Sequence, residues 1–201
     1  CGEIKAILHP GYILQPSIKK IKKLVKPKEF IGIDSLIIGG SRGLGELTAK
    51  ILTSGKGNVN ITYFNGRKEA LKLKKIIEFE TRQNCKTEKL DILDGNFINK
   101  IKKFPNYDFI FYYPTPKIFR KKKEHFDHKI FKNFYKYYVK KFILMCNLLD
   151  KKINKKLIVF FPSTVFIKET PRYLKEYIKA KLIAEKLIKK LNSKFSKLKV
   201  I

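Results

Sequence analysis

With 201 residues, 44% of them hydrophobic, the chain can bury one good core, which excludes two complete domains and favours a single globular domain with a short appendage. The formal charge of +29 would suit nucleic acid or an acidic membrane, but lysine supplies nearly all of the 46 basic residues and is spread over every predicted helix. Phosphate and base recognition favours the guanidinium fork of arginine, so we expect a solvated, compositionally biased surface rather than a nucleic-acid partner.

Residues 1–33 do not share the pattern of the rest of the chain. Residues 2–8 are compatible with one strand, and prolines bracket a short basic helix over residues 17–25. We interpret this segment as a linker or the end of an upstream module, and place the main domain at residues 34–201. Because the chain begins at Cys1 and stops inside an apolar stretch, we expect it to be part of something longer, with the domain truncated after its sixth strand.

From Ile37 onward, short apolar runs rich in β-branched and aromatic residues alternate with amphipathic stretches, which is typical of a parallel sheet with crossover helices. Strands are predicted at 35–39, 59–64, 87–91, 108–113, 156–162 and 198–201. Helices are predicted at 43–54, 67–80, 95–103, 126–150 and 171–192. Right-handed crossovers then give an α/β fold, a Rossmann-type doubly wound parallel sheet in three αβα layers, with the ligand crevice at the carboxyl ends of the strands.

A glycine-rich turn, Gly39-Gly40-Ser41-Arg42-Gly43-Leu44-Gly45, follows the first predicted strand and opens a helix. This is the context that a dinucleotide-binding motif requires. Gly39 can make the tight turn, Gly43 lets the backbone approach a pyrophosphate, and Gly45 lets helix and strand pack closely, while free N–H groups of the turn face the phosphates. A strand-to-helix turn without a ligand would not need glycine at all of these positions.

The spacing Gly-x-x-x-Gly-x-Gly resembles that of the short-chain dehydrogenase/reductase family and differs from the Gly-x-Gly-x-x-Gly of other Rossmann enzymes. The resemblance covers residues 35–201. It implies an NAD(P)-dependent oxidoreductase in which Gly39, Ser41, Arg42, Gly43, Leu44 and Gly45 bind the dinucleotide. Ile38 stands where the family has threonine, and since that hydroxyl supports the turn, we expect a less rigid loop with an intact backbone cradle.

The end of the second predicted strand indicates which nicotinamide cofactor is preferred. A site for NAD would place Asp or Glu there to accept from the ribose hydroxyls, but the sequence is Tyr63-Phe64-Asn65-Gly66-Arg67. Arg42 and Arg67 would clamp a 2′-phosphate, so NADP(H) is favoured over NAD(H), although Arg67 can equally be an exposed helix-start residue. Asp91 and Ile92, at the end of the third strand, resemble the family's adenine contact.

Tyr177 and Lys181 are four residues apart, so on a helix their side chains share one face. This matches the family's Tyr-x-x-x-Lys pair, which implies that Tyr177 passes a proton to a carbonyl or alkoxide oxygen and that Lys181 holds the nicotinamide ribose. A nearby ammonium favours the phenolate, so we expect the pKa of Tyr177 to fall from about 10 toward the working pH. The spacing alone is a weak signal in so lysine-rich a chain.

The fifth predicted strand ends at Ser163 and Thr164, and Thr164 precedes Tyr177 by thirteen residues, as the family's catalytic Ser or Thr does. Thr164 would hydrogen-bond the substrate oxygen, with Ser163 as the second candidate, although either hydroxyl can instead cap the turn. There are departures from the family. Tyr112-Tyr113-Pro114-Thr115 replaces Asn-Asn-Ala-Gly, and Tyr138 stands about where a helix asparagine belongs, so a proton-relay water is held differently or activity is low.

The resemblance therefore implies interconversion of a carbonyl and an alcohol in a small molecule, such as a 3-oxoacyl thioester. The linker and the Tyr-Pro-Thr-Pro strand end resemble reductase modules fused behind a hot-dog dehydratase-like domain, so an upstream fused domain and a homo-oligomer are both open. Two other functions remain. One is a sugar-nucleotide epimerase or dehydratase of the extended branch, suggested by Phe161-Pro162-Ser163-Thr164. The other is a non-catalytic Rossmann scaffold that binds cofactor or polyanion.

The cysteines and histidines indicate neither a disulfide framework nor a metal site. Cys1, Cys85 and Cys146 are odd in number and far apart, which fits reduced thiols. His125 and His128 lack a third ligand nearby and follow a run of lysines that repels cations, so we expect surface positions. Without a run of about 18 uncharged apolar residues or a secretory signal, we expect a cytoplasmic protein with no membrane span.

Overall fold

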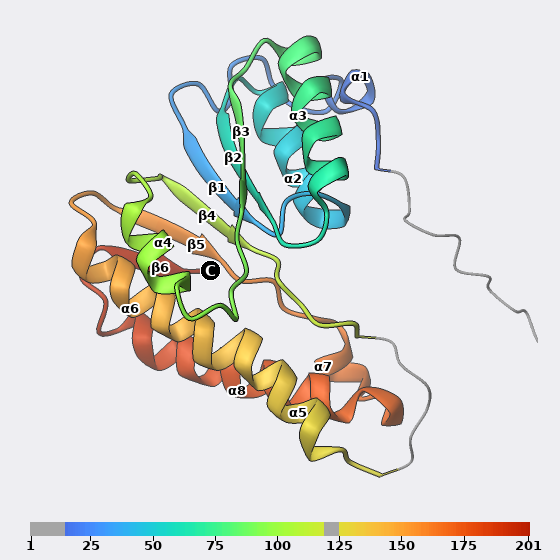
Figure 1. Ribbon diagram of the computed structural model, residues 1–201, viewed down its shortest axis with the longest axis vertical. Helices are drawn as coiled ribbons and strands as arrows, with labels where there is room; N and C mark the ends of the chain where they lie inside the picture. The colour runs from blue at the N-terminus through green and yellow to red at the C-terminus, as the bar shows by residue number, and fades with distance from the viewer. Residues whose placement is uncertain (1–14, 119–124) are drawn as a thin grey trace, which may run out of the picture.

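A computed structural model describes residues 15–118 and 125–201, and a parallel sheet of six strands runs through it (Figure 1). The strands are β1 (Asp34–Ile38), β2 (Asn58–Tyr63), β3 (Cys85–Lys89), β4 (Phe109–Tyr112), β5 (Leu157–Phe160) and β6 (Leu198–Val200). Their order across the sheet is β3-β2-β1-β4-β5-β6, and every neighbouring pair is parallel. The order reverses between β1 and β4, which confirms the predicted doubly wound fold and puts the switch point there.

Helices cover the two faces of the sheet. One face carries α1 (Ile18–Ile21), α2 (Gly43–Ser54) and α3 (Arg67–Thr81). The other carries α4 (Phe97–Lys103), α5 (His128–Tyr135), the π-helical turn η1 (Lys136–Lys141), α6 (Phe142–Lys152) and α8 (Lys175–Asn192). The short helix α7 (Phe166–Glu169) and the 3₁₀ turn η2 (Arg172–Leu174) connect β5 to α8. The sheet is therefore the middle layer of three.

Each face of the sheet packs on its own hydrophobic core, because successive strand side chains point to opposite faces. Ile37 and Ile61 face α2 and α3 and pack with Ala49 and Ile77. Leu36 and Ile38 point the other way, into the larger core beneath α4, α5, α6 and α8. Strands buried on both faces need apolar residues at consecutive positions, which explains the continuous apolar runs in the sequence.

The predicted elements match the observed ones closely, with four differences, the first of which is that the helix predicted over 171–192 begins only at Lys175, as α8 after the 3₁₀ turn η2. The strand limits and those of α2, α3 and α4 differ from prediction by at most two residues. The predicted helix over 126–150 is a run of α5, η1 and α6, with π-helical geometry in its middle. The basic helix predicted over 17–25 is shorter, and α7 was not predicted. Such irregularities depend on tertiary packing, which a periodic pattern does not encode.

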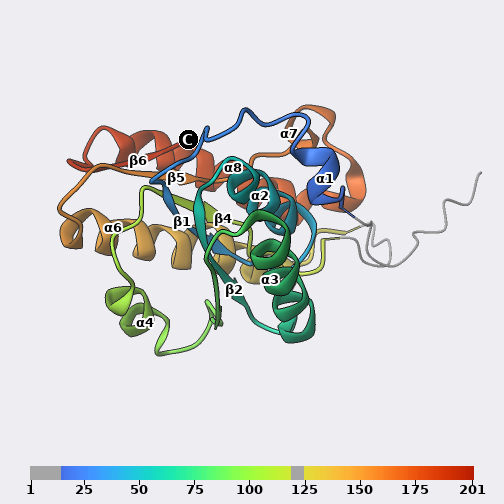
Figure 2. The same ribbon diagram turned by 90° about the horizontal axis from the view of Figure 1, so that it is seen from above.

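The described part of the N-terminal segment packs against the main domain. Ile18 is fully buried in the smaller core, and α1 lies against α2 (Figure 2). The Lys50 ammonium on α2 is 2.6 Å from Glu46 Oε1 and donates to the Pro16 carbonyl at 3.1 Å, which ties down the start of the segment. The strand predicted over residues 2–8 lies outside the described residues. An upstream module remains a prediction.

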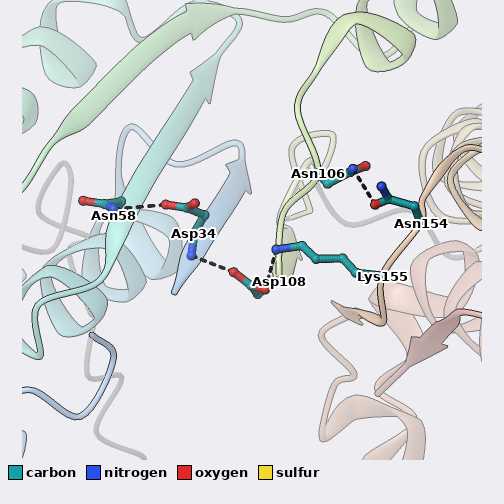
Figure 3. A network of polar contacts seen from close by, with 6 residues as sticks. All are labelled: Asp34, Asn58, Asn106, Asp108, Asn154 and Lys155. Carbon is teal, nitrogen blue, oxygen red and sulfur yellow. Dashed lines mark hydrogen bonds and ion pairs between the residues drawn. The ribbon is translucent and has the colours of Figure 1, made fainter. Parts of the chain in front are cut away.

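At the amino ends of the strands, a polar network fixes the start of β1 relative to β4 and β5 (Figure 3). Asp108 Oδ2 accepts from the Asp34 N–H at 2.9 Å, and Asp108 Oδ1 accepts from Lys155 Nζ at 2.6 Å. Asn58 Nδ2 donates to Asp34 Oδ1 at 3.0 Å, which adds β2 to the network. These contacts hold the edge of the sheet opposite the predicted ligand crevice.

The two described cysteines are free and buried. Burial raises the pKa of Cys85 to about 12 and that of Cys146 still further, so both thiols stay protonated at neutral pH. Cys1 lies outside the described residues. In the described part of the chain, no helix combines the length and the apolar character needed to cross a bilayer.

Candidate functional site

A cavity of about 550 Å³ opens at the carboxyl ends of β1, β2, β4 and β5, which is the expected place for a ligand in a doubly wound sheet. It gathers most of the residues that the sequence singled out. The predicted residues that line it are Gly39, Ser41, Arg42, Gly43, Leu44, Gly45, Asp91, Ile92, Ser163, Tyr177 and Lys181. Arg67 and Thr164 are absent from that lining.

The glycine turn has the backbone geometry that its residues suggested. Gly39 and Gly43 have φ of +79° and +58°, conformations that residues with a side chain rarely adopt. A Cβ on Gly45 would lie 2.5 Å from the Gly39 carbonyl oxygen, so only glycine lets α2 pack this closely on the turn. Helix α2 begins at Gly43, and the Arg42 side chain makes no capping bond to it. The N–H groups of its first turn are therefore presented to the cavity.

Thr62 on β2 supports this turn, and sequence reasoning missed it. Its side chain is fully buried. The Gly39 N–H donates to Thr62 Oγ1 at 3.3 Å, and the Gly40 N–H donates to the Thr62 carbonyl at 2.9 Å. The hydroxyl beside the turn thus comes from the neighbouring strand, while Ile38 packs in the core. The sequence feature that could have indicated this role is a threonine near the end of a buried strand.

The two arginines predicted to bind a 2′-phosphate differ in position: one lines the cavity and the other does not. Arg42 belongs to the cavity lining, as do Tyr63 and Phe64, whereas Arg67 is exposed at the first position of α3. The predicted pair of guanidinium groups is therefore not assembled, and Arg42 alone is placed there. Asp91 is the one carboxylate among the described lining residues, and its Oδ1 accepts from the Leu93 N–H at 2.9 Å.

Tyr177 and Lys181 lie on the inner face of α8, one turn apart, as the spacing predicted. Both are buried, with 6% and 3% of their surface exposed, and both line the cavity. The residue before the tyrosine, Glu176, accepts from the Asp127 N–H at 2.6 Å and so fixes α8 against the start of α5. The structure thus brings the pair to the same cavity as the glycine turn.

The expectation that the pKa of Tyr177 falls below its usual value is wrong. Burial raises the pKa of Tyr177 above its usual value, a hydrogen bond with Thr164 partly opposes that rise, and Glu185 adds to it. The ammonium of Lys181 is directed elsewhere: Nζ donates to the Pro162 carbonyl and lies 4.2 Å from the centre of the Tyr138 ring. The shared face of α8 brings the side chains of Tyr177 and Lys181 near each other, but the Lys181 ammonium points to other partners.

Lys181 occupies an apolar environment. Its Nζ is also 4.1 Å from the centre of the Phe161 ring. Burial lowers the pKa of Lys181 to about 7, which the Glu185 carboxylate partly opposes. The neutral amine is therefore far more accessible near neutral pH than for a solvated lysine.

The two hydroxyl candidates at the end of β5 have different partners. Thr164 lies close enough to Tyr177 to oppose the rise of its pKa, but its Oγ1 accepts from the Phe166 N–H at 3.4 Å, as a turn cap does, and it does not line the cavity. Ser163 lines the cavity, but its Oγ donates to Glu185 Oε1 at 2.6 Å. Of the two hydroxyls, Thr164 therefore lies nearer to Tyr177, whereas Ser163 binds the Glu185 carboxylate.

Tyrosine hydroxyls occupy the region where the family pattern was not followed. Tyr138 is almost fully buried on η1, and its hydroxyl hydrogen-bonds with Thr115 Oγ1 beyond the end of β4. The Tyr112 hydroxyl donates to the Tyr137 carbonyl at 2.8 Å, and the Tyr113 hydroxyl pairs with Thr48 at 2.8 Å. These contacts tie η1 and α2 to the end of β4.

The histidines take no part in this site. His125 and His128 are exposed near the start of α5, and the Phe126 ring packs edge-on against His128 at 5.2 Å. Across the described ranges, no group of three or more potential metal ligands comes together.

Comparison with known proteins identifies the fold of the chain. No family model and no curated protein matches the sequence. FolM alternative dihydrofolate reductase 1 from Brucella canis, solved with NADP, is 12% identical with a TM-score of 0.71, covering 83% of this chain and 70% of that one. A putative short chain dehydrogenase from Escherichia coli CFT073 is 15% identical with a TM-score of 0.71, covering 86% and 80%. A short chain dehydrogenase from Shigella flexneri is 14% identical with a TM-score of 0.72, covering 87% and 72%. The chain therefore has the fold of the short-chain dehydrogenases.

Proposed function

We propose that this chain is an NADP(H)-dependent oxidoreductase that interconverts a carbonyl and an alcohol, with Tyr177 as the proton donor and acceptor. One observation carries the proposal: the glycine turn and the pair Tyr177 and Lys181 line the same cavity at the switch point of the sheet. The first supplies a place for a pyrophosphate and the second a proton-handling group. Three solved relatives of this fold carry dehydrogenase or reductase names, which agrees with the proposal.

The residues present fit a dinucleotide. Positive φ at Gly39 and Gly43 and the missing Cβ of Gly45 leave a backbone cradle at the start of α2, where N–H groups and the helix dipole favour phosphate. Arg42 in the cavity lining supports NADP(H) over NAD(H), because a guanidinium pairs with a 2′-phosphate and the segment Tyr63-Phe64-Asn65-Gly66-Arg67 supplies no Asp or Glu to accept from a ribose hydroxyl. The FolM structures of similar fold contain NADP.

The reaction would need a hydride and a proton, and the chain handles the proton. Bound NADPH supplies the hydride to the carbonyl carbon. Tyr177 would donate its phenolic proton to the carbonyl oxygen, so that an alcohol forms, and Thr164 would hydrogen-bond the same substrate oxygen. The Lys181 ammonium would leave the Pro162 carbonyl and stabilise the phenolate left behind. In the reverse direction Tyr177 recovers the proton from the alcohol.

The finer parts of the proposal follow from the sequence. The substrate is a small carbonyl compound, with a 3-oxoacyl thioester as the first candidate, and an upstream dehydratase-like domain, self-association and a cytoplasmic location are proposed alongside it. A sugar-nucleotide epimerase or dehydratase is the competing enzyme. It predicts tightly held NAD(H) and binding of a UDP-sugar, so both ligands belong in the same assay.

The test combines binding with turnover. We expect calorimetric titration to show tighter binding of NADPH than of NADH, and NADPH oxidation over a panel of 3-oxoacyl thioesters, ketones and aldehydes. Tyr177→Phe should abolish turnover and leave the NADPH dissociation constant within about twofold, since the phenol acts in the reaction rather than in binding. Tyr173→Phe is the matched control, because Tyr173 is half exposed on η2 and outside the cavity lining. Absence of NADPH binding would refute the proposal.

A non-catalytic scaffold is the second candidate, and one observation favours it. Lys181 is engaged by the Pro162 carbonyl and two aromatic rings, and the pKa of Tyr177 lies above its usual value. A scaffold would bind NADPH and oxidise it with no member of the panel, and wild type and Tyr177→Phe would then behave alike.

A further inference from the structure

Tyr138 stands at the centre of the site, although the proposed reaction gives it no part. It belongs to η1, the π-helical turn between α5 and α6. Only 3% of its surface is exposed, yet it lines the cavity. π-Helical turns within longer helices are rare and frequently occur at functional sites, because the extra residue redirects a side chain.

The orientation of the Tyr138 ring is determined from several sides. Its hydroxyl hydrogen-bonds with Thr115 Oγ1, which follows the end of β4. The Phe134 ring stacks on it, with centroids 5.8 Å apart and planes 14° apart. The Tyr177 ring meets it edge to face at 5.8 Å and 73°. A ring fixed in this way presents a defined face to its remaining neighbour.

That remaining neighbour is the ammonium of Lys181. Its Nζ lies 4.2 Å from the centre of the Tyr138 ring and 4.1 Å from that of Phe161, and these rings are nearly perpendicular, at 86°. An ammonium deprived of water is attracted to aromatic faces. The other groups that face it are the Pro162 carbonyl, Tyr177 one turn before it and Glu185 one turn after it on α8.

We propose that Tyr138 is a positioning residue for the pair Tyr177 and Lys181, its ring setting where the ammonium lies relative to the phenol. The kinetic consequence rests on the proposed function, whereas the structural consequence does not. A role in core packing alone would be met by any apolar side chain of similar size. Positioning requires an aromatic face, so Tyr138→Phe should preserve it and Tyr138→Leu should remove it.

The decisive measurement is the NMR signal of the Lys181 ε-methylene in protein labelled with ¹³C at that carbon of lysine. The signal is identified by its absence in Lys181→Arg. Because the adjacent Nζ lies over two aromatic rings, the ε-methylene signal of Lys181 should be displaced upfield from those of the other lysines. We expect Tyr138→Phe to keep that displacement and Tyr138→Leu to lose much of it. Phe97→Leu is the control, because it removes an equally buried ring from the same core without touching Lys181.

Kinetics provide the second readout. With a substrate found in the panel, Tyr138→Phe should keep kcat within about threefold of wild type, and Tyr138→Leu should lower it about tenfold, the size of a desolvated cation–π contact. Phe97→Leu, measured where it is folded, should keep kcat.

The two readouts separate the failures. A wild-type protein that binds NADPH without turnover would end the proposed function, and the NMR signal would still decide the role of Tyr138. If Tyr138→Leu does not fold, Tyr138→Met fills the space with a flexible chain that has no ring. Its Lys181 signal should lose much of the upfield displacement, as expected for Tyr138→Leu. A Lys181 signal that stays in place without the ring, or that moves as far in Tyr138→Phe, would overturn the inference.

Discussion

Replacing Gly45 by alanine probes the glycine turn through a single methyl group. The new Cβ would lie 2.5 Å from the Gly39 carbonyl oxygen and 2.6 Å from Gly40 Cα. Both are backbone atoms, so relief requires moving the turn itself or sliding α2 away from the sheet. Inserting a methyl group into packed structure costs about 1–3 kcal/mol, and here the displacement falls on the atoms that would hold a pyrophosphate. We expect the free energy of unfolding to fall by that amount and NADPH affinity to fall at least about tenfold.

Gly95→Ala is the matched control for this prediction. A Cβ on Gly95 would meet nothing within 4 Å, and that residue does not have a left-handed backbone conformation. Its replacement should therefore leave stability unchanged or slightly raised, because alanine reduces the freedom of the unfolded chain. Urea denaturation gives the free energies of unfolding, and calorimetric titration gives the NADPH dissociation constants. If Gly45→Ala unfolds and binds NADPH as Gly95→Ala does, the turn is not the cradle described above.

Two further predictions concern the supports of the site and of the sheet. Thr62→Val keeps the side-chain shape but leaves the Gly39 N–H without its side-chain acceptor, so unfolding free energy should fall by about 1–2 kcal/mol and NADPH should bind less tightly; unchanged urea and calorimetric curves would contradict this. Burial alone would raise the pKa of Asp108 and Asp150, but their hydrogen bonds, including that from Lys155, outweigh it and lower both values. The stability that these carboxylates contribute is complete above about pH 4 and is lost as the pH falls through their folded-state pKa values. The urea midpoint should therefore drop in acid, and the double variant Asp108→Asn with Asp150→Asn should flatten that drop; an equally steep acid limb would count against the assignment.

Much of the sheet was predictable because parallel strands buried on both faces leave a continuous apolar signature, which β1, β4 and β5 carry, whereas the edge strand β3 is mostly polar. Helix α2 was predicted to the residue, since glycine at its start and Gly55 at its end mark both limits. The π-helical turn η1 was not predicted. Its sequence continues the helical periodicity of α5 and α6, and the irregularity arises where Tyr138 must meet Thr115 and Lys181 at once.

In the candidate site, backbone features could be predicted more reliably than side-chain directions. Gly39 and Gly43 have the left-handed backbone that their type and order suggested. Arg67 did not reach the cavity, because the first position of α3 points it into solvent. Thr62 escaped notice since its partner, the Gly39 N–H, is far away in the sequence and adjacent only across the sheet. Sequence spacing defines a helix face, but contacts from other elements decide where a long side chain goes.

Contacts from other elements also explain why the pKa of Tyr177 is raised where a lowered value was expected. The direction of this shift matters for the proposed chemistry. With its pKa raised by burial, Tyr177 is almost fully protonated at neutral pH. A phenol that keeps its proton suits the reduction of a carbonyl, in which the proton is given away. Oxidation of an alcohol needs the phenolate, whose population falls about tenfold for each pH unit below the pKa. The phenol therefore starts in the form that reduction needs, and Lys181 has to be drawn toward Tyr177 to stabilise the phenolate in either direction, from a place that the Tyr138 ring helps to set.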